Sequence, residues 1–340
     1  MKDIHSNFFE KLFDEKIVSA LYIPIKKGDQ IFPALINSKE YLDNAVLFSP
    51  VMPVSGAVEL SRITKLASPS EIIGVVLKPC EIRAAVELIK IRQINLENIV
   101  LIGVDCIGTY EPEFYEKEKP ENIDESNIRD VCKICSYPSP TFADIELGFI
   151  GGDVIEAKTD KGKEIFEKMG IKQERRDEQE VKKIVERREK IKDKVITDVS
   201  QKIKGIDNLR KYFERCINCH NCMKVCPICY CHECFFDSDV FRFEGDRYLR
   251  WVDKKGILQM PKDSLIFHIG RMYHMALSCV GCGMCEQACP REIDVATVFI
   301  LVGREGDKVF DYTPGISIEE PLPLLTFKDD EFKEVGNEEV

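Results

Sequence analysis

The sequence predicts an α/β (or α+β) N-terminal domain, a long charged helical linker and a cysteine-rich C-terminal domain. Three observations support this organisation. Short β-branched runs alternate with helical patterns over the first 155 or so residues, charged residues become dense from Thr159 to about Leu209, and cysteines cluster beyond residue 215. A chain of 340 residues has room for two or three domains. We expect them to cover residues 1–158, 159–210 and 211–300, followed by an acidic tail at 301–340.

The N-terminal domain is predicted from its apolar runs. We expect helices at Ala57–Leu66 and Glu81–Gln93, and strands at Ile17–Ile25, Ala45–Ser49, Ile72–Leu77 and Ile99–Val104. The order strand, helix, strand between Ile72 and Val104 is a βαβ unit. Such a unit favours parallel pairing of its two strands with a right-handed crossover.

The charged linker carries apolar residues at helical spacing. One face of a long amphipathic helix would hold Val181, Ile184, Val185, Arg188, Ile191, Val195 and Val199. This helix would either connect the two domains and pack on its own protein, or offer its apolar face to a partner.

Eight of the 15 cysteines form two matched runs. The runs read Cys216-x2-Cys219-x2-Cys222-x3-Cys226-Pro227 and Cys279-x2-Cys282-x2-Cys285-x3-Cys289-Pro290. Three thiolates at two-residue gaps wrap three corners of an iron–sulfur cube, and the cysteine before proline reaches across to the other cube in two-cluster ferredoxins. We therefore expect one [4Fe–4S] cluster at Cys216, Cys219, Cys222 and Cys289, and a second at Cys279, Cys282, Cys285 and Cys226. The C-terminal domain is thus predicted to be bacterial-ferredoxin-like, with an insertion between its two runs.

Composition narrows the functional class. Lys and Arg total 48 and Asp and Glu total 59, so the net charge is −11, which argues against a nucleic-acid partner. The apolar stretches are too short for direct membrane insertion, and the start of the chain shows no secretory signal. So many thiols without a leader predict a reducing cytoplasm rather than a disulfide framework. A zinc site would need two paired knuckles instead of three cysteines in series.

Four further cysteines lie in the first domain. Cys80 follows one predicted strand and opens a helix, and Cys106 ends the next strand. Both thiols would lie at the carboxyl edge of a parallel sheet, where ligands bind in open α/β folds. The knuckle Cys132-x2-Cys135 could close over that edge. Single cysteines are often small core residues, and a lone Cys-x2-Cys pair often binds zinc or is redox-active. Four together predict a third [4Fe–4S] site.

Three cysteines remain after these two groups, at Cys229, Cys231 and Cys234. They directly follow the first ferredoxin-type run. They could form a fourth metal site completed by His232 or by a partner, one of them could replace Cys226, or they could shield the cubes from solvent. In the insertion, Arg271 could raise a cluster's potential through its charge.

Several motifs of the first domain carry a resemblance to a known family. They are Leu77-Lys78-Pro79-Cys80-Glu81, Ile102-Gly103-Val104-Asp105-Cys106, Thr159-x-Lys161-Gly162, and Cys132-x2-Cys135 followed by Ala143-Asp144-Ile145-x2-Gly148-x2-Gly151. With them, roughly residues 45 to 165 resemble the beta subunits of coenzyme F420-reducing hydrogenases and F420-dependent formate dehydrogenases. In that family the four matching cysteines would hold a [4Fe–4S] cluster beside an FAD. The resemblance therefore implies both cofactors here.

Residues that could contact a flavin are few. No Rossmann glycine fingerprint follows a strand. Gly148 and Gly151 could let backbone approach the ring or a phosphate, although such glycines often only form turns. Ser55 and Gly56 could bind a pyrophosphate at a helix N-terminus or simply cap it. Lys78 and Lys161 could place positive charge near the cofactor, although most lysines are solvated.

The predicted function is electron transfer in an iron–sulfur flavoprotein subunit of an anaerobic oxidoreductase. It would exchange electrons between a hydride carrier, F420 or NAD(P)H, and a partner subunit through [4Fe–4S] clusters. Partners would be a formate dehydrogenase, a hydrogenase or a heterodisulfide-reductase-like assembly. A flavin-free electron wire and an iron–sulfur sensor or scaffold are the alternatives. No side chain stands out as a general base or nucleophile, and we expect none to be catalytic.

Overall fold

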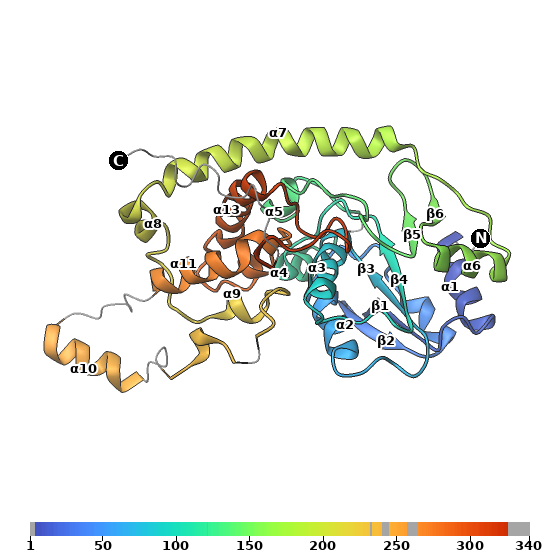
Figure 1. The fold of residues 1–340 in the computed structure, drawn as a ribbon, viewed down its shortest axis with the longest axis horizontal. Helices are drawn as coiled ribbons and strands as arrows, with labels where there is room; N and C mark the ends of the chain where they lie inside the picture. Colours follow the sequence, from blue (N-terminus) through green and yellow to red (C-terminus); the bar gives the residue numbers. More distant parts are fainter. Residues whose placement is uncertain (1–3, 121, 232, 240–244, 257–263, 326–340) are drawn as a thin grey trace.

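A computed structural model describes residues 4–120, 122–231, 233–239, 245–256 and 264–325. Its N-terminal part contains one six-stranded sheet with the order β2-β1-β3-β4-β5-β6 (Figure 1). The bounds are β1 Ala20–Lys27, β2 Gln30–Ile36, β3 Ile73–Leu77, β4 Ile99–Val104, β5 Ile145–Gly148 and β6 Val154–Ala157. The four central strands, β1, β3, β4 and β5, pair in parallel, and the two edge strands pair antiparallel. The predicted α/β domain with parallel βαβ elements is confirmed.

Helices cover both faces of the sheet because successive side chains of a strand point to opposite faces. On one face, Val75 and Leu77 of β3 pack with α2 (Gly56–Thr64) and α3 (Pro79–Lys90). On the other face, Val76 packs with α1 (Ile4–Asp14) and α6 (Asp160–Met169). Strands β3 and β4 are buried throughout, which explains their continuous apolar runs.

The predicted strand at Ala45–Ser49 is wrong. This segment makes one isolated bridge, between Ala45 and Ile25, and otherwise forms a loop. The bridge lies on the edge of β1 that pairs with β3 at Ala20–Tyr22, whereas the opposite edge pairs with β2 through a two-residue turn at Gly28 and Asp29. Gly28 has φ +62°, the left-handed conformation that tight hairpin turns favour.

The charged segment forms three helices instead of one. They are α6, α7 (Glu178–Lys202) and α8 (Ile206–Tyr212). Helix α7 carries the predicted apolar stripe, of which Arg188 and Val199 are buried and Ile191 is 39% exposed, and it also buries Ile196, which the prediction did not include. It lies along both the sheet part and the cysteine-rich part of the chain and packs against α13 and α5 (Figure 1). The stripe therefore faces the rest of the same chain.

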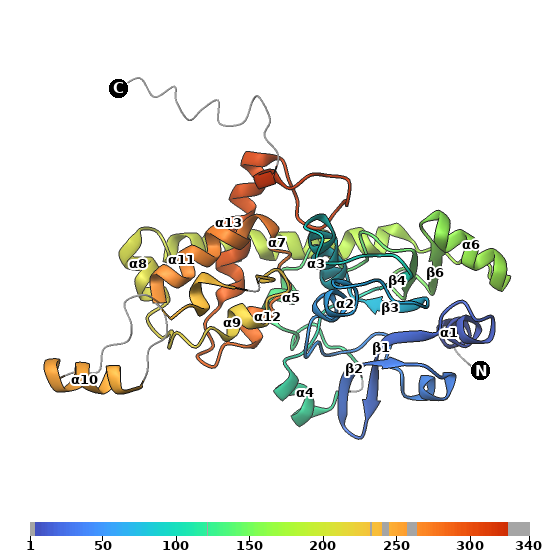
Figure 2. The ribbon, with the colours of Figure 1, turned by 60° about the horizontal axis from the view of Figure 1, so that its bottom comes forward.

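The cysteine-rich part is helical and shares a core with the sheet. Its helices are α9 (Asn221–Lys224), α10 (Gly245–Lys255), α11 (Ser264–Met275), α12 (Met284–Gln287) and α13 (Val295–Phe310). One continuous apolar cluster joins Leu77 and Val86 of the first part to Met275 and Val298 of the second. Figure 2 shows α3 between the sheet and these helices. Short helices α4 (Pro112–Glu118) and α5 (Asp130–Lys133) lie in the loop between β4 and β5.

The C-terminal tail was expected to begin at residue 301, but the first ten residues of that range belong to helix α13. Helix α13 continues to Phe310, and the chain beyond it packs on α3. Arg83 donates to the main-chain oxygen of Pro314 at 2.7 Å, and Tyr312 is buried. The rest of the predicted tail, 326–340, lies outside the described residues. Among the described helices, none has both the length and the apolar character needed to cross a bilayer.

Candidate iron–sulfur centres

The eight cysteines of the matched runs gather into two groups. We name site A the group whose members line one cavity, Cys216, Cys219, Cys222 and Cys289. We name site B the second group, in which Cys226 lies close enough to act electrostatically on its three partners, Cys279, Cys282 and Cys285. Each site thus takes three cysteines from one run and one from the other. This is the exchange of the fourth ligand that the spacing predicts.

The two runs use the same backbone turns. Asn218 and Gly281 stand at matching positions and have φ +55° and +67°, and His220 and Gly283 match with +60° and +72°. These left-handed residues turn the chain sharply between successive cysteines, so that three thiols face one point. Backbone N–H groups then donate to sulfur in site A, from Asn218 to Cys216 and from Ile293 to Cys289, both at 3.4 Å.

Site A is surrounded by aromatic and positively charged groups. The guanidinium of Arg271 donates to Cys222 Sγ at 3.0 Å. Burial raises the pKa of Cys222 to about 11, and the charge of Arg271 opposes this shift. His268 approaches Cys216 Sγ at 3.3 Å and stacks on Phe213. Burial, with a contribution from Arg271, lowers the pKa of His268 to about 3, so its ring is neutral at pH 7.

The four cysteines of the first domain line a common cavity, which we name site C: Cys80, Cys106, Cys132 and Cys135. Cys80 lies in the first turn of α3, directly after β3, and Cys106 lies two residues beyond the end of β4. Because β3 and β4 are parallel, both thiols meet at the carboxyl edge of the sheet. Helix α5 carries Cys132, and the loop after it carries Cys135. Cys282 of site B lines the same cavity.

The thiols of site C are removed from water. Burial raises the pKa of Cys80 well above its ordinary value, and Glu81, Cys282 and Cys106 add to the shift. Burial also raises the pKa of Cys106, against the opposing charge of Lys78. Such thiols ionise when a metal replaces the proton, which is the chemistry of a metal-binding thiolate. The donor set therefore fits an iron–sulfur cube.

A search of the described residues for three or more His, Cys, Asp or Glu side chains that could hold one metal ion finds none. A cube is held at its corners by thiolates that stand apart, so this result concerns single-ion sites.

Cys229, Cys231 and Cys234 line another cavity, beside site B. Cys229 Sγ lies 3.1 Å from Met275 Sδ, and Cys234 Sγ lies 3.6 Å from Met223 Sδ. His232, their expected fourth ligand, lies outside the described residues.

Comparisons with known proteins agree with this geometry. Residues 212–293 match the family model of the 4Fe-4S dicluster domain, which supports two iron–sulfur clusters in this part of the chain. The F420-dependent formate dehydrogenase subunit beta of Methanocaldococcus jannaschii is 28% identical, over 93% of this chain and 92% of its own length. The F420-dependent formate dehydrogenase 1 subunit beta of Methanococcus maripaludis is 30% identical, over 93% and 91%. The chain belongs to this family of beta subunits.

The resemblance stated from the sequence is thereby confirmed, and this beta-subunit-type chain is an oxidoreductase subunit. A chain of the F420-reducing [NiFe] hydrogenase complex of Methanosarcina barkeri aligns with 60% of this chain and 87% of its own length, at 15% identity. Its TM-score of 0.44 is too low to support an argument about the fold.

One of the predicted flavin contacts of this formate dehydrogenase beta-type chain, Gly56, has an internal partner. The N–H of Gly56, at the start of α2, donates to Glu81 Oε1 at 2.6 Å. This buried carboxylate occupies the N-terminus of α2, which favours the alternative that Ser55 and Gly56 only begin the helix over the alternative that they bind a pyrophosphate. The hydroxyl of the neighbouring Ser55 is buried and has no hydrogen-bond partner among the described residues.

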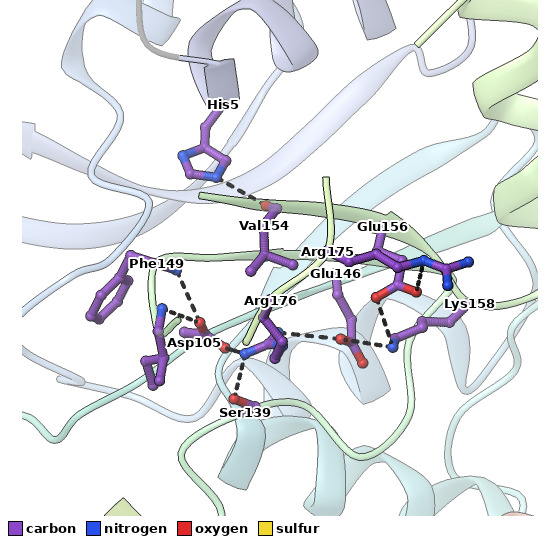
Figure 3. Close-up of polar contacts among 11 residues, drawn as sticks. His5, Asp105, Ser139, Glu146, Phe149, Val154, Glu156, Lys158, Arg175 and Arg176 are labelled. Atoms are coloured by element: carbon purple, nitrogen blue, oxygen red, sulfur yellow. Dashed lines mark hydrogen bonds and ion pairs between the residues drawn. The ribbon is translucent and has the colours of Figure 1, made fainter. Parts of the chain in front are cut away.

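Gly148 lies against the carboxylate of a buried ion pair between Asp105 and Arg176, which Figure 3 shows, and Gly151 packs against the main chain of Asp177. Asp105, next to Cys106, pairs with Arg176 at 2.7 Å and accepts the N–H groups of Phe149 and Ile150 at 3.0 Å. A Cβ at Gly148 would lie 2.2 Å from the Asp105 carboxylate, and one at Gly151, where φ is +77°, would lie 2.4 Å from a main-chain oxygen. Both glycines therefore allow close packing of the chain on itself, which favours the alternative that they only form turns.

Lys161 lies at the wrong edge of the sheet for a flavin beside site C. Its ammonium group donates to the main-chain oxygen of Ile99 and lies 3.6 Å from Asp144. Ile99 begins β4, whereas Cys106 follows its end. The two edges are about 20 Å apart at the rise of an extended strand. The position of Lys161 therefore does not support a role beside a flavin at site C.

Lys78 lies beside site C, where a positive charge was predicted near the cofactor. It is 5% exposed, donates to the main-chain oxygen of Ser49 at 2.6 Å, and acts electrostatically on Cys106. It lines both site C and an adjoining apolar cavity, which we name the sheet-edge cavity. The phenol of Tyr22, which lines that cavity, is 7% exposed and its hydroxyl has no hydrogen-bond partner among the described residues. Tyr22 was not predicted from the sequence, because a tyrosine in a strand usually packs in the hydrophobic core.

Proposed function

We propose that this chain is the electron-transferring beta subunit of a multi-subunit oxidoreductase that exchanges electrons with a hydride carrier. The carrier is F420, on which the two formate dehydrogenase relatives depend by name, or NAD(P)H. One observation supports this most strongly. Cys282 of site B lines the cavity of site C, and Cys226 links the first cysteine run to site B, so the three sites follow one another in the order C, B, A.

The proposed cofactors of this relay are three [4Fe–4S] clusters. The ligands are the four cysteines of each site, and buried arginines stand beside them. Arg129, for example, approaches Cys132 Sγ at 3.7 Å. Cys219 of site A is exposed, which suits site A as the point where electrons pass to a partner subunit. That partner is proposed to be a formate dehydrogenase, hydrogenase or heterodisulfide-reductase-like subunit.

The proposed flavin would bind against the outer side of the sheet-edge cavity, because the cavity's own volume of about 20 Å³ holds about one water molecule. Bound FAD would supply the conversion between a two-electron hydride and single electrons. The cavity offers the free hydroxyl of Tyr22 as a hydrogen-bond donor and the ammonium group of Lys78 as a positive charge. Met52 and Val76 give it apolar walls that exclude water. Met52 and Lys78 also line site C, so a flavin here would lie next to that cluster.

Anaerobic purification of the full chain, followed by iron and flavin counts, tests these assignments. We expect about 12 irons per chain for three cubes. The double variant Cys80→Ser/Cys106→Ser should hold about eight irons and keep the clusters of sites A and B. A wild-type value of about eight would remove site C from the list of cluster sites.

The flavin count separates the proposed function from a flavin-free electron wire. We expect one FAD per chain in the wild type and a markedly smaller fraction in Tyr22→Phe/Lys78→Met. If protein that has been incubated with FAD contains about 12 irons per chain but no flavin, the result would favour the flavin-free electron wire.

A further inference from the structure

We propose that site B is the electron reservoir of the relay, because three buried arginines give it a higher reduction potential than sites A and C. The inference rests on the proposed function only in assuming that the sites hold cubes. A cube held by four thiolates is an anion and becomes more negative on reduction. A nearby cation in a low-dielectric interior therefore favours the reduced form and raises the potential.

Arg271 lies between sites A and B. Its side chain comes from α11, is 2% exposed, and donates to the sulfur and the main-chain oxygen of Cys222 at 3.0 and 3.1 Å. Its charge also acts on Cys226 and Cys285 of site B. Phe267 and Phe299 pack against the guanidinium on the remaining sides. Among the described residues no carboxylate forms an ion pair with it.

Arg129 lies between sites B and C. It is 5% exposed, donates toward Cys132 Sγ at 3.7 Å, and hydrogen-bonds Gln287 of α12 at 3.1 Å. Its charge acts on Cys132 and Cys80 of site C and on Cys282 of site B. The described part of the chain provides it with no ion pair to a carboxylate.

Arg83 acts on site B from a third direction. It extends from α3, is 5% exposed, and donates to the main-chain oxygen of Val280, the residue after Cys279, at 3.0 Å. Its charge lowers the pKa of Cys279, against the larger effect of burial. The guanidinium lies 3.8 Å from the centre of the Tyr137 ring, and its other hydrogen bonds go to main-chain oxygen. Within the described ranges it has no ion pair either.

A buried charge is costly unless an anion compensates it. Carboxylates do not form ion pairs with these three arginines within the described residues, so the compensating anions are the thiolates and the cubes they hold. Site B is acted on by all three arginines, whereas site A is acted on by Arg271 and site C by Arg129 and Lys78. Site B therefore has the largest number of buried cations, although the direct contacts of Arg271 and Arg129 are to a sulfur of site A and of site C. Each transfer oxidises one cube by one electron and reduces the next by one, so electrons arriving singly from site C come to rest first on site B.

Redox titration of the full chain, monitored by electron paramagnetic resonance, tests the inference with Arg83→Gln, Arg129→Gln and Arg271→Gln. We expect the first cube reduced in the wild type to be the central one, whose signal broadens when either neighbour is reduced. The midpoint potential of this cube should fall in all three variants by at least about 59 mV, which for one electron is a tenfold change in the equilibrium constant of reduction. The potential of a second cube should also fall in two of the variants. This second cube should be the one of site A in Arg271→Gln and the one of site C in Arg129→Gln.

The matched controls either keep the buried positive charge or remove a positive charge that is exposed to water. Arg83→Lys, Arg129→Lys and Arg271→Lys should restore most of the potential, and Arg291→Gln, which removes an exposed cation at site A, should change little because water screens it. If a glutamine variant loses iron, the wild-type order of reduction decides the question. The inference is overturned if the central cube is not the first reduced, or if its potential shifts in no more than one variant. A count of eight irons would instead contradict site C alone.

Discussion

Asp105 shows at the scale of single residues how a position beside a predicted metal ligand can serve the fold. It directly precedes Cys106, yet its carboxylate accepts two main-chain N–H groups and the guanidinium of Arg176 (Figure 3). Both side chains are almost fully buried. Glu146 contacts the same guanidinium at 3.3 Å, so this cation, unlike Arg271, has carboxylate partners.

Asp105→Ala should lower the free energy of unfolding by about 3–5 kcal/mol, because it leaves the buried Arg176 with much of its charge unpaired. Chemical denaturation of the full chain measures this. Arg175→Ala is the matched control, since Arg175 is 78% exposed and forms an ion pair with Glu156 at 3.5 Å. An exposed pair contributes about 0–1 kcal/mol. Equal losses in the two variants would contradict the account of the ion pair.

Some roles of single residues can be predicted from the sequence, and others cannot. The ligand sets of sites A and B follow from spacing, because a two-residue gap fixes where three thiols of one loop can point. The partners of Gly56 and Lys161 do not follow from spacing. Glu81 and Ile99 become their neighbours only when α2, α3 and the sheet have packed.

At the scale of elements, the βαβ unit was predictable and the sheet edges were not. Strands β3 and β4 are long apolar runs because both of their faces are covered. Strands β5 and β6 have four residues each, too few to establish a period, and β2 carries a proline. The apolar stripe of α7 was visible in the sequence, but its burial against the same chain was a matter of tertiary packing.

Helix α7 should contribute to stability through its buried residues, which include Ile196 and exclude Ile191 of the predicted stripe. Ile196→Ala removes a side chain that is 6% exposed and should lower the free energy of unfolding by about 2–5 kcal/mol. Ile191, on the same helix, is 39% exposed, and its change to alanine should have a much smaller effect. Chemical denaturation of the two variants makes the comparison. Equal small effects would mean that α7 does not pack as described.

At the scale of the whole molecule, one apolar core joins the sheet to the cysteine-rich part. This core fixes site C beside site B, and the exchange of Cys226 and Cys289 fixes site B beside site A. The sequence could predict that Cys80 and Cys106 share a sheet edge. It could not predict that this edge faces Cys282, because that contact depends on how the two parts pack.

The most direct test of the relay follows electrons from a hydride carrier. Full chain reconstituted with FAD is mixed with reduced F420 without oxygen, and the reduced clusters are counted by electron paramagnetic resonance. In Cys80→Ser/Cys106→Ser, sites A and B should no longer be reduced by F420 although dithionite still reduces them. In the matched variant Cys216→Ser/Cys219→Ser, sites C and B should be reduced as in the wild type. Reduction of sites A and B by F420 at the wild-type rate without site C would contradict the relay.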